Sequence, residues 1–207
     1  WKMADVWHEL LTNVLRHQRY VAAGCDVGAL VTGQLGHKYA DEVLAIHIGS
    51  ALKLDFFNGD MAWTINRGLA IPDGLPSPLR EAVIATQKKF AVHLTAHMLD
   101  SSTLSYALAD SPVGMLAWLL KRWDAWSDDD NDVETVFGRN DILTHATIYG
   151  AGNGIDTSIR TYANNNRYPW QPAHSRMPVV QAPTGITFVG YENPPGVHTT
   201  DERVRNF

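Results

Sequence analysis

The most constraining feature of the chain is a glycine-bracketed aspartate between an apolar run and a helix-compatible segment. Its five residues are Gly24, Cys25, Asp26, Val27 and Gly28. Residues 19–23 before it are typical of a buried strand, and residues 29–35 after it are typical of a helix. Small residues two places before and after Asp26 suit a sharp strand-to-helix turn, because side chains there would strike the neighbouring strand or helix. The pattern predicts an α/β fold with Asp26 exposed at the turn.

An aspartate in such a turn has two interpretations. In the first, its carboxylate is a nucleophile that attacks an sp3 carbon and forms an ester, whereas serine in the same turn transfers an acyl group. In the second, Asp26 is a helix N-cap that accepts backbone N–H bonds. The five residues alone favour the cap.

The composition is that of an ordinary globular chain of 207 residues, 45% hydrophobic and 19% charged, long enough for a sizeable core. A net charge of -5 with scattered basic residues argues against a nucleic-acid or anionic-membrane partner. No apolar stretch reaches the length that spans a bilayer. The single cysteine, Cys25, excludes an internal disulfide framework and indicates a reducing compartment, so we expect a cytoplasmic protein.

The hydrophobic pattern predicts strands that alternate with helices, which indicates a parallel sheet. The expected strands are residues 20–23, residues 43–48, and residues 179–183 with an extension at 186–189. The expected helices are residues 4–16, a helix from the turn to about His37, and residues 79–98, 104–109, 113–126 and 141–162. We therefore expect an α/β core over residues 1–50, a mainly helical lid over residues 51–176, and a return to the core over residues 177–207.

The sequence predicts no metal or cofactor site. The nine histidines are dispersed without a ligand-pair motif, and we interpret His37 as a surface or helix-end residue. The acidic run over residues 128–132 lacks the glycine and the final glutamate of a calcium loop, so we interpret it as a solvated loop.

Several segments together resemble the epoxide hydrolases of the microsomal and juvenile-hormone type, which are members of the α/β-hydrolase superfamily. These segments are residues 19–29, 106–114 with 116–118, 141–144 with 148–149, 158–162 and 183–185. The stretch Ala-Leu-Ala-Asp-Ser-Pro-Val-Gly over residues 107–114 is the most specific of them. The resemblance implies an α/β-hydrolase fold with an inserted helical lid, an apolar epoxide as substrate, and no cofactor.

The resemblance also implies the chemistry of the turn. Asp26 attacks one epoxide carbon and forms a covalent alkyl ester, which water hydrolyses to a vicinal diol. The backbone N–H of Val27 is one donor of the oxyanion hole. Glu192 matches the carboxylate that orients the general base. Taken alone, Glu192 would be a surface acid.

Two positions of the lid match the family's acids, which hold the epoxide oxygen. Tyr162 matches one lid tyrosine, although alone it would be a packed helix-end aromatic. His93 falls where the family usually has a second lid tyrosine, and an imidazole N–H there can hydrogen-bond an epoxide oxygen. His97, one helical turn on, competes with His93 for this role.

The sequence departs from the family at several points. Its 207 residues contain neither the His-Gly-Trp-Pro-Gly type loop before the turn nor the Gly-Gly-His that supplies the general base. His198 lies too near Glu192 to replace that base. Cys25 stands for a glycine, and Val27 and Gly150 stand for tryptophans. We expect an incomplete polypeptide that does not turn over epoxides as written.

Two other functions stay open. A haloalkane dehalogenase shares the aspartate turn and the ester, but it needs a halide-binding pair, often with tryptophan where this chain has Val27. A truncated α/β-hydrolase without the general base would bind apolar ligands without catalysis. A homodimer also stays open, because a sheet of about three parallel strands leaves its edges and an apolar face uncovered.

Overall fold

The computed structural model of the chain describes residues 1–49, 74–128, 130, 132–165, 168, 170–189, 201, 204 and 207. These residues belong to two compact units. The first, called the α/β unit here, takes its residues from Trp1–Ala62, Pro72–Val83 and Pro169–Phe207, and the second, called the helical unit, from Trp63–Ile71 and Ile84–Tyr168. The domain boundaries after residues 50 and 176 stay a prediction.

The α/β unit begins with helix α1 (Lys2–Glu9), which continues as a π-helical turn, η1 (Leu10–Val14). This confirms the helix predicted from the apolar spacing over residues 4–16. Ala4 is buried in the core, and Asp5 accepts hydrogen bonds of 2.8 Å from the Lys38 ammonium and from the Tyr39 hydroxyl. These bonds tie α1 to the residues that end the next helix.

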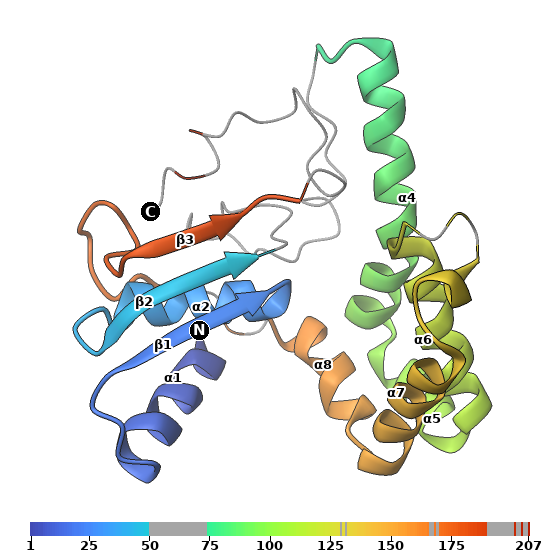
Figure 1. Ribbon diagram of the computed structural model, residues 1–207, viewed down its shortest axis with the longest axis horizontal. Coiled ribbons are helices and arrows are strands. Elements are labelled where there is room, and N and C mark those ends of the chain that lie inside the picture. The colour runs from blue at the N-terminus through green and yellow to red at the C-terminus, as the bar shows by residue number, and fades with distance from the viewer. Residues whose placement is uncertain are drawn as a thin grey trace. The chain divides into compact units, whose positions relative to one another are not determined.

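Three parallel strands form the sheet in the order β1 (Tyr20–Cys25), β2 (Val43–Gly49), β3 (Thr184–Thr187). Helix α2 (Val27–Lys38) packs against β1 and β2 (Figure 1). Because side chains alternate along a strand, Ile46 and Ile48 are buried in the core while His47 between them is exposed. The strand–helix–strand unit that the sequence predicts is confirmed.

On the opposite face of the sheet, Val21 of β1 is 64% exposed. Within the described residues, β1 and β3 each pair with β2 alone. For this part of the chain, the pairing agrees with the expected open edges, and the uncovered apolar face stays a prediction.

The third strand is shorter and lies later than predicted. Residues 179–183 were predicted as a strand, but the N–H groups of Gln181 and Ala182 donate to the carbonyl of Gly36, at 3.2 and 3.3 Å, instead of to a strand. The sheet is reached only when the Pro183 carbonyl accepts from the N–H of Ile46 at 2.8 Å. Residues 179–183 are mainly apolar because they pack against α2, and a short apolar run of this kind has the same pattern as a buried strand.

His37 corrects a second expectation, because it is 1% exposed and not a surface residue. Its Nδ1 donates to the Val179 carbonyl at 2.7 Å, and its Nε2 accepts from the N–H of Ala173 at 2.9 Å. The His37 carbonyl in turn accepts from Nε2 of His174 at 2.9 Å. His37 therefore fastens the segment before β3 to the end of α2.

The helical unit continues from Ile84 along α4 (Ser77–Leu99) into the remaining helices of the described chain. These are α5 (Ser101–Asp110), α6 (Pro112–Trp126), the 3-10 turn η2 (Val133–Thr135), α7 (Arg139–Gly152) and α8 (Ile155–Asn165). Ser111 ends α5 and caps α6, because its hydroxyl accepts from the N–H of Gly114 at 3.0 Å and Pro112 occupies the first turn. The Ala-Leu-Ala-Asp-Ser-Pro-Val-Gly stretch is thus a junction between two helices.

One predicted helix is two helices. Residues 141–162 were predicted as a single helix, but α7 and α8 are separated by Asn153, whose φ of 48° is left-handed, and by Gly154. A left-handed residue ends a helix because it turns the next carbonyls away from the helix axis. After this break in the chain, Ile155 and Ile159 of α8 pack with Leu108 and Met115. Among the described residues, no helix is long and apolar enough to cross a membrane.

Candidate active site

Asp26 is the single residue between β1 and α2, and its backbone is held at φ 50° and ψ -122°. This conformation is strained for any residue except glycine. The Asp26 carbonyl accepts the first helical bond, from the N–H of Ala29 at 3.0 Å. Its side chain makes no capping bond among the described residues. The predicted turn is confirmed, and the conventional side-chain cap is absent from it.

The tight turn depends on Gly24 and not on Gly28. A Cβ placed on Gly24 would lie 2.3 Å from the Gly28 carbonyl oxygen and 2.7 Å from the Thr32 hydroxyl. A Cβ placed on Gly28 would meet nothing within 4 Å. The expectation that both places must be small is therefore right for Gly24 and wrong for Gly28, because the close approach is between Gly24 and the backbone of Gly28.

The Asp26 carboxylate is accessible at the turn but partly desolvated. The residue is exposed, yet burial of the carboxyl by the surrounding protein raises the pKa of Asp26, and the nearby N–H of Val27 partly offsets the rise. Desolvation disfavours the charged form, whereas a backbone N–H favours it. Val27 therefore supplies a dipole to the carboxylate, as an oxyanion donor would.

Asp26 also lies at the edge of the sheet where parallel strands end. β1 ends at Cys25, β2 at Gly49 and β3 at Thr187, and all three run in one direction. In open parallel sheets this is the edge that binds ligands. Glu192, five residues beyond Thr187, and His198 lie outside the described residues, so the role of Glu192 stays a prediction.

Tyr162 and His93 are hydrogen-bonded to each other in the helical unit. His93 of α4 and Tyr162 of α8 are joined by a bond of 2.9 Å between Nε2 and the phenol oxygen. Their rings meet edge to face, with centroids 5.3 Å apart. Trp126 also packs against His93 edge to face, with centroids 5.0 Å apart. Aromatic contacts of this kind fix the orientation of both rings.

His97 lies against the same pair but makes no hydrogen bond among the described residues. Its ring centroid is 4.0 Å from that of His93 and 4.8 Å from that of Tyr162, and it stacks on Trp118 at 5.8 Å. Both ring nitrogens of His97 are buried without a partner, as is Nδ1 of His93. His97 therefore packs as an aromatic ring.

Both histidines are neutral at physiological pH. Burial lowers the pKa of His93 to about 3, with His97 and Arg122 as smaller causes, and burial with Arg122 lowers the pKa of His97 to about 4. Arg122 lies over Trp118, 3.8 Å from its ring centroid, and donates to the Trp118 carbonyl at 3.1 Å. Arg122 was not predicted from the sequence, because no sequence signal distinguishes it from other helix-surface arginines.

The structure thus brings together three of the predicted residues, Tyr162, His93 and His97, in the helical unit. Asp26 and Val27 lie in the α/β unit. That the two groups converge on one substrate stays a prediction. Among the described residues, no group of three or more His, Cys, Asp or Glu side chains could hold a metal ion.

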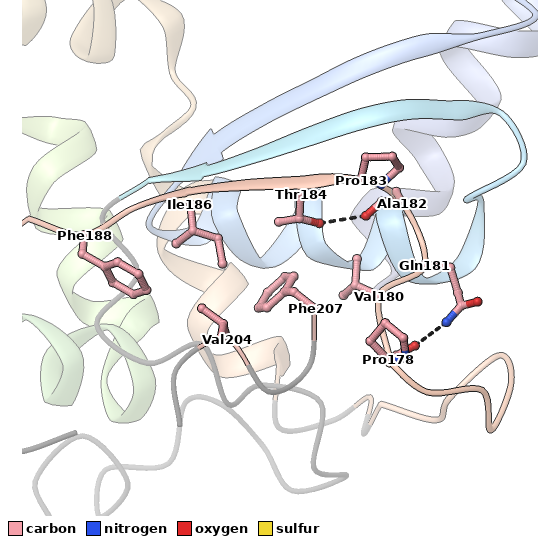
Figure 2. A pocket seen from close by; sticks show the side chains of 10 residues that line it. All are labelled: Pro178, Val180, Gln181, Ala182, Pro183, Thr184, Ile186, Phe188, Val204 and Phe207. Atoms are coloured by element: carbon pink, nitrogen blue, oxygen red, sulfur yellow. Dashed lines mark hydrogen bonds between the residues drawn. The ribbon is translucent and has the colours of Figure 1, made fainter. Parts of the chain in front are cut away.

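A cavity of about 510 Å³ opens beside β3 in the α/β unit (Figure 2). Its lining is mainly apolar and includes Val180, Ile186, Phe188 and Phe207. Neither Asp26 nor Val27 lines it, and the described lining residues include no titratable side chain. The described part of its lining therefore offers no group for acid, base or nucleophilic chemistry.

Comparison with known proteins identifies relatives that are named as epoxide hydrolases. No protein-family model matches the chain. A Stigmatella aurantiaca protein provisionally named as an epoxide hydrolase is 29% identical over an alignment of 176 residues that covers 80% of this chain and 36% of that protein. Epoxide hydrolase 1 of Oryctolagus cuniculus is 25% identical over 88% of this chain and 43% of its own length. The juvenile hormone epoxide hydrolase of Bombyx mori is 24% identical over 79% and 38%.

Solved structures share the fold. An enantioselective mutant of the Aspergillus niger epoxide hydrolase superposes with a TM-score of 0.61 and 21% identity, over 94% of this chain and 46% of that one. The silkworm juvenile hormone epoxide hydrolase superposes with a TM-score of 0.59 and 22% identity, over 88% and 45%. The chain therefore spans less than half the length of the relatives it matches. It has the α/β-hydrolase fold, and it is a distant homologue of the microsomal and juvenile-hormone epoxide hydrolases.

Proposed function

We propose that this chain carries the nucleophile, a proton donor and the relay carboxylate of an epoxide hydrolase that opens an apolar epoxide to a vicinal diol. One observation carries the proposal. Asp26 is held at φ 50° at the end of a parallel strand, with the N–H of Val27 beside its carboxylate. A strained backbone of this kind is typical of functional positions, because the strain lowers stability and packing alone does not require it. Homology over 80% of the chain supports the same activity.

In the first step, a carboxylate oxygen of Asp26 bonds to an epoxide carbon as the ring carbon–oxygen bond breaks. The released oxygen takes the phenol proton of Tyr162, which becomes a phenolate. Partial desolvation destabilises the charged carboxylate, so conversion to a neutral ester removes that cost. The small apolar epoxide needs no metal for this step, because the phenol supplies the acid.

In the second step, water adds to the ester carbonyl carbon while a general base oriented by Glu192 takes its proton. The Val27 N–H stabilises the oxyanion of the tetrahedral intermediate. The departing diol oxygen receives the proton from the base, and the proton lost by the regenerated Asp26 carboxyl returns to Tyr162. The 207 residues contain no Gly-Gly-His after Glu192, so on this polypeptide we expect the ester to persist.

The test is intact mass spectrometry of the 207-residue chain after incubation with styrene oxide. We expect one stable adduct that peptide mapping assigns to Asp26 and that is absent from Asp26→Asn. Asparagine is the matched control because it tolerates the left-handed backbone without the nucleophilic oxygen. An adduct that persists in Asp26→Asn, or many turnovers per chain, would contradict this assignment.

The same experiment separates the other functions. Halide release from a chloroalkane, without an adduct from styrene oxide, would identify a dehalogenase. Saturable binding of styrene oxide with no covalent product would identify an apolar-ligand binder without catalysis.

A further inference from the structure

The hydrogen bond between His93 and Tyr162 has two arrangements of its protons. Either the Tyr162 hydroxyl donates to Nε2 of His93, or a proton on Nε2 donates to the phenol oxygen, and the 2.9 Å distance fits both. Only the second leaves the phenol proton for another acceptor. The choice therefore decides whether Tyr162 can act as an acid toward a substrate.

The second ring nitrogen of His93, Nδ1, decides between the two proton arrangements. Burial keeps His93 neutral, since it lowers the pKa to about 3, and a neutral imidazole carries one N–H. Nδ1 of His93 is buried and has no partner among the described residues. A proton on Nδ1 would be a buried N–H with no acceptor, whereas a bare Nδ1 is only an unused acceptor. Orphaned buried N–H groups are the rarer of the two in folded proteins.

Among the described residues, the surroundings of His93 offer no hydrogen-bond acceptor that would reverse this choice. The rings packed against it belong to His97 on α4, Trp126 on α6 and Tyr162 on α8. Arg122, whose charge also lowers the pKa of His93, is a hydrogen-bond donor and not an acceptor. Both nitrogens of His97 are themselves buried without a partner. The cluster therefore holds His93 with its single proton on Nε2.

We propose that His93 is a positioning residue for Tyr162: its Nε2–H donates to the phenol oxygen, so that Tyr162 presents its own proton to the oxygen of the substrate. This rests on the proposed epoxide-opening function, and it replaces a second direct acid with one acid and one orienting imidazole. His97 then serves as a packed ring behind the pair. The expectation that an imidazole touches the epoxide oxygen itself becomes unnecessary.

A double-mutant cycle on single-turnover alkylation tests the relation between the two residues. We expect Tyr162→Phe to slow adduct formation by roughly 10- to 1000-fold and His93→Leu to slow it by about 10-fold, the loss of one hydrogen bond. Because His93 acts through Tyr162, the double variant should be no slower than Tyr162→Phe. Multiplication of the two effects would overturn the proposal, since it would mean that His93 contacts the substrate independently.

Two further variants control for structure. His93→Gln places an amide N–H where Nε2–H lies and should recover part of the rate lost in His93→Leu. The chain offers a matched pair in the α/β unit, where Nδ1 of His8 and the Tyr20 hydroxyl are also 2.9 Å apart. His8→Leu removes the same kind of bond and should leave the alkylation rate unchanged while the variant stays folded by circular dichroism.

A second readout needs no activity. Nitrogen-15 NMR of the wild-type chain should show His93 with a protonated Nε2 and a bare Nδ1. The opposite tautomer would refute the proposal even if styrene oxide labels Asp26. If the chain forms no adduct but His93 has the Nε2–H tautomer, the epoxide function fails and the positioning of Tyr162 stands.

Discussion

The α/β unit holds Asp26 through its backbone, whereas the helical unit holds Tyr162 through side chains. Asp26 is fixed by a strand, a helix and the contact of Gly24 with the Gly28 backbone, all within a few consecutive residues. Tyr162 is fixed by His93, which is 69 residues away in the chain, and by the ring of His97. The first arrangement tolerates no added atom at Gly24, whereas the second tolerates substitution that preserves ring packing and the hydrogen bond.

The largest expected effect is at Gly24. Gly24→Ala should destabilise the α/β unit by about 3 kcal/mol or more, because the new methyl group would lie 2.3 Å from backbone rather than from a flexible side chain. Chemical denaturation followed by circular dichroism measures the loss.

Gly28→Ala is the matched control for this prediction. The added methyl group would meet nothing within 4 Å. The substitution should be neutral or stabilising by up to about 1 kcal/mol, since alanine is the better helix former. Equal destabilisation by both substitutions would break the comparison, because the turn would then depend on both glycines.

The helical unit should lose stability in acid through its buried histidines. The pKa of His93 falls from 6.5 to about 3 and that of His97 to about 4 on folding, so the unfolded chain binds more protons below pH 6.5. The two histidines contribute to the free energy of unfolding above pH 6.5. This contribution is lost as the pH falls toward about 3, at up to about 1.4 kcal/mol per pH unit for each proton. Near-ultraviolet circular dichroism against pH follows this loss at the neighbouring Trp118 and Trp126.

Substitution of the two histidines tests the cause. A variant with His93→Gln and His97→Phe should shift the acid midpoint to lower pH, because neither replacement takes up a proton. His145→Gln is the control, since His145 is an exposed residue of α7 whose Nδ1 donates to the Asp141 carbonyl. A midpoint that moves equally in the control would assign the acid sensitivity to other groups.

The smallest expected effect is at Asp26, where stability and function conflict. Asp26→Gly should stabilise the chain by about 1 kcal/mol, because glycine adopts a φ of 50° without strain, and it should abolish alkylation. Asp26→Ala should be less stable than Asp26→Gly by roughly 1–2 kcal/mol, since its Cβ keeps the strain. Thermal denaturation measures both, and identical melting of the two variants would show that the turn stores no strain.

Much of the fold can be predicted from the sequence. The strands at residues 20–25 and 43–49 and the helices α1, α2, α4, α5 and α6 follow from hydrophobic spacing, glycines and a serine cap, which act over a few neighbours. The turn at Asp26 was predictable for the same reason, because its geometry depends on consecutive residues.

Other features depend on contacts between distant parts of the chain, and local patterns do not encode them. Residues 179–183 have the apolar pattern of a strand, but hydrogen bonds from Gln181 and Ala182 to Gly36 hold them on α2, and the strand begins at Thr184. His37 is polar yet fully buried, because backbone groups of Ala173 and Val179 satisfy both of its nitrogens. Burial and hydrogen-bond partners arise only when separate segments pack, so the pairing of His93 with Tyr162 and the low pKa of His93 were set by the folded chain.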